Sequence, residues 1–171
     1  MKNKLLKILL CFSLMIGGMA LSSYRYHDSN LGFALELPEG WEIGQAPNDK
    51  TVVMLSPMEG EDDPFRENMN VIVTELDADI SLQDLFNLNV NNAKMMLPSF
   101  EAIAVEPLEI SGAPAMKLIY SFEIEGTTLK NIVYILLKGR TMYTITFSCL
   151  EQRFDEFRPA FETIGSSFQL P

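Results

Sequence analysis

The sequence contains few of the residues from which catalytic and metal sites are usually built. Its 171 residues include two cysteines and one histidine. Structural zinc sites need several Cys or His ligands, and hydrolytic triads need a base that is usually His. No glycine-rich nucleotide-binding loop occurs in the sequence either. These shortages argue against a zinc protein, a nucleotide-binding enzyme and a conventional hydrolase, and we expect no cofactor.

Basic residues are also scarce, because 13 Lys and Arg stand against 23 Asp and Glu, which gives a formal net charge of −10. Such a surface repels nucleic acid and anionic lipid headgroups, so we expect neither as a partner. The hydrophobic fraction of 47% is nevertheless enough to fill a core, and the length suits one domain. The chain is therefore predicted to fold as a single domain with an acidic surface.

The first residues have the pattern of a signal peptide. Met1–Lys7 carries three lysines, Ile8–Met19 is almost wholly apolar, and a small-x-small pattern follows. The apolar run would span only about 18 Å as a helix, less than the roughly 30 Å of a hydrocarbon core. We therefore predict a cleaved signal peptide over residues 1–20, a single domain over 21–171, and export to the periplasm or the extracellular space. No stable membrane span would remain after cleavage.

Hydrophobic alternation predicts most of the remaining chain to be β-structure. Short turns join the last four predicted strands, which favours an antiparallel meander. Trp41, after the turn Pro38-Glu39-Gly40, is expected to plug the core. The predicted strands are 31–37, 51–56, 69–76, 103–110, 115–124, 128–138 and 141–150.

Two helices are predicted from apolar residues at three- and four-residue spacing. The first begins after Ser81, which forms a capping-box pattern with Asp84, and ends before Pro98. The second begins near Phe154, is broken or restarted at Pro159, and is weakened at its end by Gly165. The core stripe of the first helix is Leu82, Leu85, Phe86, Ala93, Met96 and Leu97.

Together these elements define the fold class as α+β, with a central, mainly antiparallel β-sheet of about six to seven strands flanked by helices. Hydrophobic periodicity does not say whether the two helices cover the same face of the sheet.

A dense acidic segment is the main candidate for a metal site. Carboxylates are hard oxygen ligands that suit Ca²⁺ or Mn²⁺, and Asp77 and Asp79 could add to such a site. The segment lacks the alternating Asp-x-Asp-x-Asp-Gly spacing of a calcium loop, so a solvated acidic loop is the competing interpretation. The acidic segment consists of Glu59, Glu61, Asp62 and Asp63.

Two further residues allow a hydrolase hypothesis. His27 is followed by Asp28, which makes a His-Asp pair conceivable, although the position near the mature terminus favours an exposed histidine. Cys149 would be the one cysteine left after signal cleavage, so no internal disulfide could form. It closes an apolar strand with no basic neighbour before Arg153, which favours a small core residue over a reactive thiol.

Four segments together resemble one family. They are Tyr26–Phe33 running into Leu37-Pro38-Glu39-Gly40-Trp41-Glu42, then Phe65–Val71, Ile110–Ala115 and Ile164–Phe168. The sequence is similar to PsbP-related or DcrB-like secreted proteins, whose fold is shared with Mog-type Ran-binding proteins. The resemblance implies an α/β/α sandwich and a non-enzymatic role. PsbP is an extrinsic subunit of photosystem II, Mog-type proteins bind a small GTPase, and many prokaryotic relatives are exported.

Within the resemblance, Arg66, Glu67 and Asn68 are polar residues at the entrance of a predicted strand. They either satisfy backbone groups there or form part of a partner surface. The leading hypothesis is an exported, non-enzymatic accessory domain that docks to a protein partner in the cell envelope. A divalent-cation binder that uses the acidic loop is the alternative, and a hydrolase is the remote one. The sequence leaves the oligomeric state and the partner's identity open.

Overall fold

The computed structural model describes residues 23–61 and 63–171, so the predicted signal peptide and Asp62 lie outside the described residues. The described chain forms strands, two α-helices and one short 3₁₀ helix. In chain order they are β1 (Ser23–Asp28), β2 (Phe33–Pro38), β3 (Glu42–Ile43), β4 (Thr51–Leu55), β5 (Asn68–Glu75), α1 (Leu82–Met96), β6 (Glu101–Ile110), β7 (Ala113–Ile124), β8 (Thr127–Lys138), β9 (Thr141–Leu150), η1 (Glu151–Arg153) and α2 (Phe154–Ser166).

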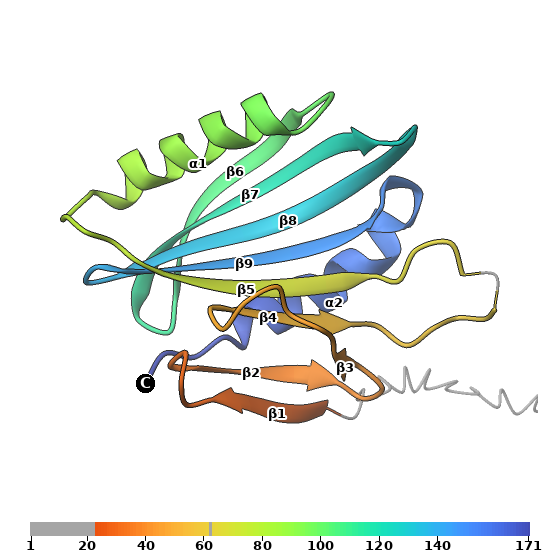
Figure 1. The fold of residues 1–171 in the computed structure, drawn as a ribbon, viewed down its shortest axis with the longest axis horizontal. Coiled ribbons are helices and arrows are strands. Elements are labelled where there is room, and N and C mark those ends of the chain that lie inside the picture. Colours follow the sequence, from red (N-terminus) through yellow and green to blue (C-terminus); the bar gives the residue numbers. More distant parts are fainter. Residues whose placement is uncertain (1–22, 62) are drawn as a thin grey trace, which may run out of the picture.

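The main sheet has seven strands in the order β3-β4-β5-β9-β8-β7-β6, and every neighbouring pair is antiparallel. The predicted meander of the last four strands is confirmed, since β6 to β9 are sequential neighbours. Strand β5 adds to the outer side of β9, with Val71 opposite Ile145. The hairpin β1-β2 forms a separate small sheet below the main one (Figure 1).

The N-terminal hairpin corrects the sequence prediction. The strand expected at 31–37 exists as β2 but lies outside the main sheet, where it pairs with β1. Neither β1 nor the two-residue β3 was predicted. Most β1 side chains are exposed, so this strand lacks the alternation that reveals a half-buried strand. The connecting turn is held by Asp28, whose Oδ1 accepts from the backbone N–H groups of Asn30 and Leu31 at 3.0 and 2.9 Å.

The two helices cover opposite faces of the main sheet, which makes the fold an α/β/α sandwich. Helix α1 packs on β7 and β8, with Phe86 and Leu118 in one apolar cluster. Helix α2 and β2 share the other, larger cluster, in which the rings of Phe147 and Phe161 lie 5.1 Å apart. In Figure 1, α1 lies above the sheet and α2 behind it.

Helix α1 starts where the sequence predicts, because Ser81 Oγ accepts from the Asp84 N–H at 3.1 Å. Its predicted core stripe is only partly correct. Leu85 and Phe86 are buried, but Met96 is 79% exposed. Met96 therefore faces solvent, whereas the adjacent Leu97 packs against the cluster between α1 and the sheet.

Helix α2 runs without interruption through Pro159, so the predicted break is wrong. An interior proline removes a backbone hydrogen bond and costs about 3 kcal/mol. Burial of Phe154 before the proline and of Phe161 and Ile164 after it holds both halves against the sheet. Gly165 contributes to this packing, since a Cβ there would lie 2.6 Å from Tyr134 Cε2.

Trp41 is buried in the larger cluster, as predicted. The preceding Gly40 has a φ of +86°, and a Cβ there would lie 2.9 Å from Pro57 Cγ. Both the backbone conformation and the close approach require glycine at this position. The turn therefore packs closely against Pro57, at the start of the loop that joins β4 to β5.

Candidate functional site

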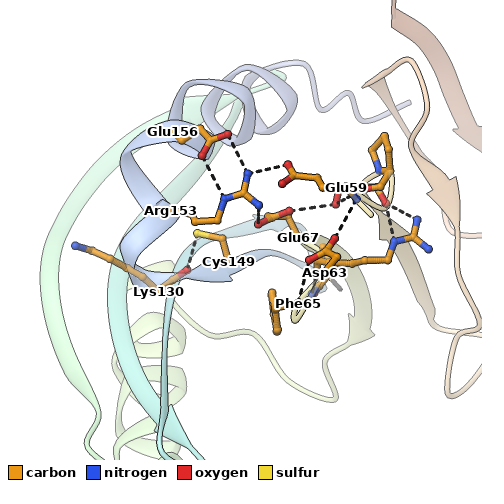
Figure 2. Close-up of polar contacts among 12 residues, drawn as sticks. Glu59, Asp63, Phe65, Glu67, Lys130, Cys149, Arg153 and Glu156 are labelled. Atoms are coloured by element: carbon orange, nitrogen blue, oxygen red, sulfur yellow. Dashed lines mark hydrogen bonds and ion pairs between the residues drawn. The ribbon is translucent and has the colours of Figure 1, made fainter. Parts of the chain in front are cut away.

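A network of charged side chains lies where β9 leads into α2 and where the chain enters β5. Its centre is Arg153, the last residue of η1. Figure 2 shows the Arg153 side chain pointing between Glu59, Glu67 and Glu156. We call this network the Arg153 cluster, and it consists of Ser56, Glu59, Glu67, Arg153 and Glu156.

Glu67 is the buried member of the cluster, with no solvent-exposed surface. Its Oε1 lies 3.3 Å from Arg153 Nη1, and its Oε2 accepts from Ser56 Oγ at 3.3 Å. Ser56 and Glu67 are also joined through the backbone, where the Ser56 N–H donates to the Glu67 carbonyl at 2.8 Å. Burial raises the pKa of Glu67, and the Arg153 charge and the Ser56 hydrogen bond oppose that rise.

Arg153 connects Glu67 to two exposed carboxylates. Its Nη2 donates to Glu59 at 2.7 Å and to Glu156 at 2.9 Å. The guanidinium also lies over the Phe157 ring, 4.6 Å from its centroid. Hydrogen bonds to Glu59 and Glu156 raise the pKa of Arg153, and the bond to Arg153 lowers that of Glu156. The cluster therefore holds the Arg153 guanidinium between the carboxylates of Glu59, Glu67 and Glu156.

The predicted partner residues Arg66, Glu67 and Asn68 have unequal roles. Arg66 Nε donates to the Ser56 carbonyl at 2.7 Å, and its Nη2 lies 3.3 Å from Glu42. Asn68 Nδ2 donates to the Arg66 carbonyl at 3.1 Å. These contacts satisfy backbone groups, and the buried Glu67 cannot touch a partner directly. A partner could reach only Arg66 and Asn68, which are both partly exposed.

The acidic segment lies in the loop from 56 to 67, in which Asp62 is outside the described residues. Glu59 is bound to Arg153, whereas Asp63 accepts from the backbone N–H groups of Glu59 and Phe65 at 3.2 and 3.1 Å. Glu61 is exposed. A groove of about 420 Å³ runs beside these residues and Arg153. The side chains of Glu59 and Asp63 are thus occupied in holding the loop.

The described part of the loop gives little support to the cation hypothesis. The Arg153 guanidinium lies beside Glu59 and Glu67, where a bound cation would need free carboxylates. Asp77 and Asp79 lie beyond the far end of β5, whose eight residues span roughly 25 Å. Among residues 23–61 and 63–171, no group of three or more acidic, His or Cys side chains is placed to hold a metal ion.

The two residues behind the hydrolase hypothesis are not brought together. His27 is exposed on β1, and the carboxylate of Asp28 accepts from Tyr26 Oη at 3.1 Å and from the hairpin turn. Cys149 is fully buried, and its Sγ donates to the Lys130 carbonyl at 3.6 Å. Burial raises the pKa of this thiol to about 12, which disfavours the nucleophilic thiolate.

Sequence reasoning did not single out Arg153 as a site residue. The available signal was the Arg153–Glu156 spacing of i to i+3 at the start of a predicted helix, which places both charges on one side. Nothing in that spacing identifies Glu59 and Glu67 as the other partners, because they belong to a different part of the chain.

A seven-stranded antiparallel sheet with one helix on each face, preceded by a hairpin, is the architecture of PsbP- and Mog-type proteins. The family model for PsbP matches residues 22–170, and the chain belongs to the PsbP family.

The similar proteins include CyanoP from Synechocystis sp. PCC 6803, which is 26% identical over 97% of this chain and 94% of its own. The solution structure of CyanoP has a TM-score of 0.68, with 24% identity over 91% of this chain and 96% of that one. LpqN of Mycobacterium tuberculosis, described as involved in cell envelope biogenesis, has a TM-score of 0.65, 15% identity and coverages of 88% and 91%. The Ran-binding protein Mog1p of Saccharomyces cerevisiae has a TM-score of 0.64, 10% identity and coverages of 88% and 96%.

Proposed function

We propose that this chain is an exported, non-enzymatic accessory protein that docks to a protein partner in the cell envelope. Membership of the PsbP family supports the accessory role. The names of two proteins of similar fold agree with it, since LpqN is linked to the cell envelope and Mog1p binds a protein. Export rests on the signal-peptide pattern of residues 1–20. None of the helices in the described residues combines the length and the apolar character that a membrane span requires.

The observation that carries the docking proposal is the anchoring of the acidic loop. Arg66 holds its start at the Ser56 carbonyl, and Arg153 holds Glu59. Anchored loops lose little conformational entropy when they bind, so their side chains can contribute more of their contact energy to affinity. The loop presents Glu61 and Met58 to solvent. The exposed carboxylate of Glu61 suits a partner with Lys or Arg side chains.

Photo-crosslinking in the native host tests this function directly. A photoreactive amino acid replaces the exposed Met58, and crosslinked proteins are identified by mass spectrometry of the cell envelope. Glu61→Lys should reduce the crosslinked product at least about fivefold, because it reverses a charge at the docking surface. Asp79→Lys makes the same charge change beyond the far end of β5 and should leave the product unchanged.

Two results would overturn the proposal. One is the absence of any reproducible crosslinked partner when the exported protein is folded and abundant. The other is an equal loss of product in Glu61→Lys and Asp79→Lys, which would indicate a general charge effect rather than docking at the acidic loop.

A further inference from the structure

Strand β6 leaves one edge of the main sheet open. It pairs with β7 on one side, and no described strand pairs with its other side. Eight of its ten residues are exposed, the exceptions being Leu108 and Ile110. At the opposite edge of the sheet, β3 offers only two residues. A long open edge can accept a further strand through its backbone groups.

The turn between β6 and β7 defines which backbone groups of β6 face outward. Ser111 and Gly112 both have positive φ, as in a two-residue hairpin turn, so Ile110 and Ala113 form the closing hydrogen-bonded pair. Hydrogen-bonded and non-hydrogen-bonded pairs alternate from there along an antiparallel ladder. The N–H groups of Val105 and Glu109 therefore point away from β7. Pro107 also faces outward but has no N–H to offer.

Apolar side chains accompany this open edge. Ile103 and Val105 on β6 are 46% and 52% exposed, which is high for their type. Met95 and Met96 in the last turn of α1 are more exposed still, and they shortly precede β6 in the chain. A strand laid along β6 would cover the two β6 side chains and bring its own alternate side chains beside them.

The charges along β6 select the kind of strand that fits. Glu101, Glu106 and Glu109 are the charged residues of β6, and Lys117 is the one cation of β6 and β7. Lys117 is already paired, with Glu106 at 2.6 Å and with Glu162 of α2 at 3.4 Å. Glu101 and Glu109 form no ion pair with any described residue. A second copy of this acidic chain would meet them with like charge, whereas a basic segment would neutralise them.

We propose that the outer edge of β6 binds an extended, basic segment of a protein partner, which adds to the sheet as an eighth strand. The segment alternates Lys or Arg with apolar residues, forms backbone hydrogen bonds with Val105 and Glu109, and skips Pro107. The bulge at Ala102–Ala104 and the proline limit the length of pairing, so only a short strand fits. This surface goes beyond the docking proposed for the acidic loop between β4 and β5, because β9, β8 and β7 lie between β5 and β6 in the sheet.

Hydrogen exchange of the isotopically labelled full chain, followed by NMR, tests the proposal. The probe is a heptapeptide of alternating Lys and Val, with a Glu-Val heptapeptide and a Lys-Gly heptapeptide as controls for charge and for strand propensity. The Lys-Val peptide should slow exchange of the Val105 and Glu109 amides at least about tenfold, because both become hydrogen-bonded. Neither control peptide should do so.

A matched pair of variants locates the hydrogen bond. Val105→Pro removes an outward N–H that β7 does not use, whereas Val105→Ala shortens the side chain but keeps the N–H. The proline variant should weaken binding of the Lys-Val peptide at least about tenfold relative to the alanine variant. If Val105→Pro unfolds, the double variant Glu101→Lys and Glu109→Lys replaces it and should reverse the preference from the Lys-Val to the Glu-Val peptide.

Several results would overturn the proposal. One is that the Lys-Val peptide leaves the Val105 and Glu109 amides unprotected, and another is that the Lys-Gly peptide protects them equally. Protection that rises with protein concentration without peptide would assign the edge to a second copy. Protection confined to the acidic loop would assign the basic peptide to the other surface. Loss of crosslinking at Met58 with intact β6 binding would instead contradict only the acidic-loop function.

Discussion

The Arg153 guanidinium lies 3.3 Å from a carboxylate of Glu67 that has no contact with solvent. Glu67 immediately precedes β5 at one end of the acidic loop, and Arg153 immediately precedes α2, so the pair joins the loop to the helix layer. Arg153 extends the connection to Glu59 at 2.7 Å. The same ion-pair network thus connects the buried carboxylate beside β5 to the loop that we propose as a docking surface.

Removal of Arg153 should be strongly destabilising. Arg153→Ala leaves the buried Glu67 carboxylate without its cation, and breaking one side of a buried pair costs about 3–5 kcal/mol. Arg153→Lys should lose less stability than Arg153→Ala, because it keeps the charge although it lacks the forked donors of the guanidinium. Glu156→Gln, which removes an exposed partner, should cost at most about 1 kcal/mol. Urea unfolding at pH 7 measures all three, and equal losses for Arg153→Ala and Glu156→Gln would contradict the central role of Glu67.

Acidification should stabilise the wild type relative to Glu67→Gln. Burial raises the pKa of Glu67, so the folded state binds a proton at pH values where the unfolded carboxyl, with a pKa near 4.5, is still ionised. The buried charge of Glu67 destabilises the folded state fully above its raised pKa. This destabilisation disappears as the pH falls to about the pKa of the unfolded carboxyl. Urea unfolding of both proteins between pH 7 and pH 4 measures the difference. A relative loss of wild-type stability over this range would mean that Arg153 lowers the pKa instead.

Gly165→Ala should destabilise the packing of α2 on the sheet. The new methyl group would lie 2.6 Å from the Tyr134 ring, and overpacking of this kind costs about 1–3 kcal/mol. The usual helix-favouring effect of alanine is smaller, at most about 1 kcal/mol. Tyr134→Leu removes the ring atoms that clash, so the cost of Gly165→Ala should fall in that background. Thermal unfolding of the four proteins in the cycle tests this, and a stabilised Gly165→Ala variant would contradict the close approach.

Cys149 should be unreactive in the folded protein. Burial excludes alkylating reagents and raises the pKa of its thiol to about 12, so little thiolate forms at pH 8. Iodoacetamide treatment followed by peptide mass spectrometry should find Cys149 unmodified under native conditions and fully modified in urea. Rapid modification of the native protein would mean that the end of β9 opens readily.

Local patterns predicted much of the fold. The alternation in 115–124 and 128–138 gave the correct strands β7 and β8, and Ser81 with Asp84 gave the correct start of α1. These features depend on residues close together in the chain, so their periodicity and capping are visible in the sequence. The family resemblance, carried by segments spread over the whole chain, was confirmed by the family match.

Other predictions failed where packing outweighed local preference. Pro159 was expected to break a helix, but burial of Phe154 and Phe161 on either side keeps α2 continuous. Met96 fits the apolar stripe of α1, yet its side chain is exposed to solvent while the adjacent Leu97 packs against the cluster. The candidate site was half predicted, since Arg66, Glu67 and the acidic segment were identified but assigned to separate hypotheses.

The sequence by itself determined the strand and helix content, the acidic surface and the meander from β6 to β9, because these depend on side-chain period, charge and short turns. Only the tertiary structure decided that the helices cover opposite faces, that β1 and β2 form a separate hairpin, and that Arg153 joins Glu59 to Glu67. Those relationships connect residues distant in the chain. They are set by which apolar faces meet in the core, and a buried charge such as Glu67 finds its partner only after those faces have packed.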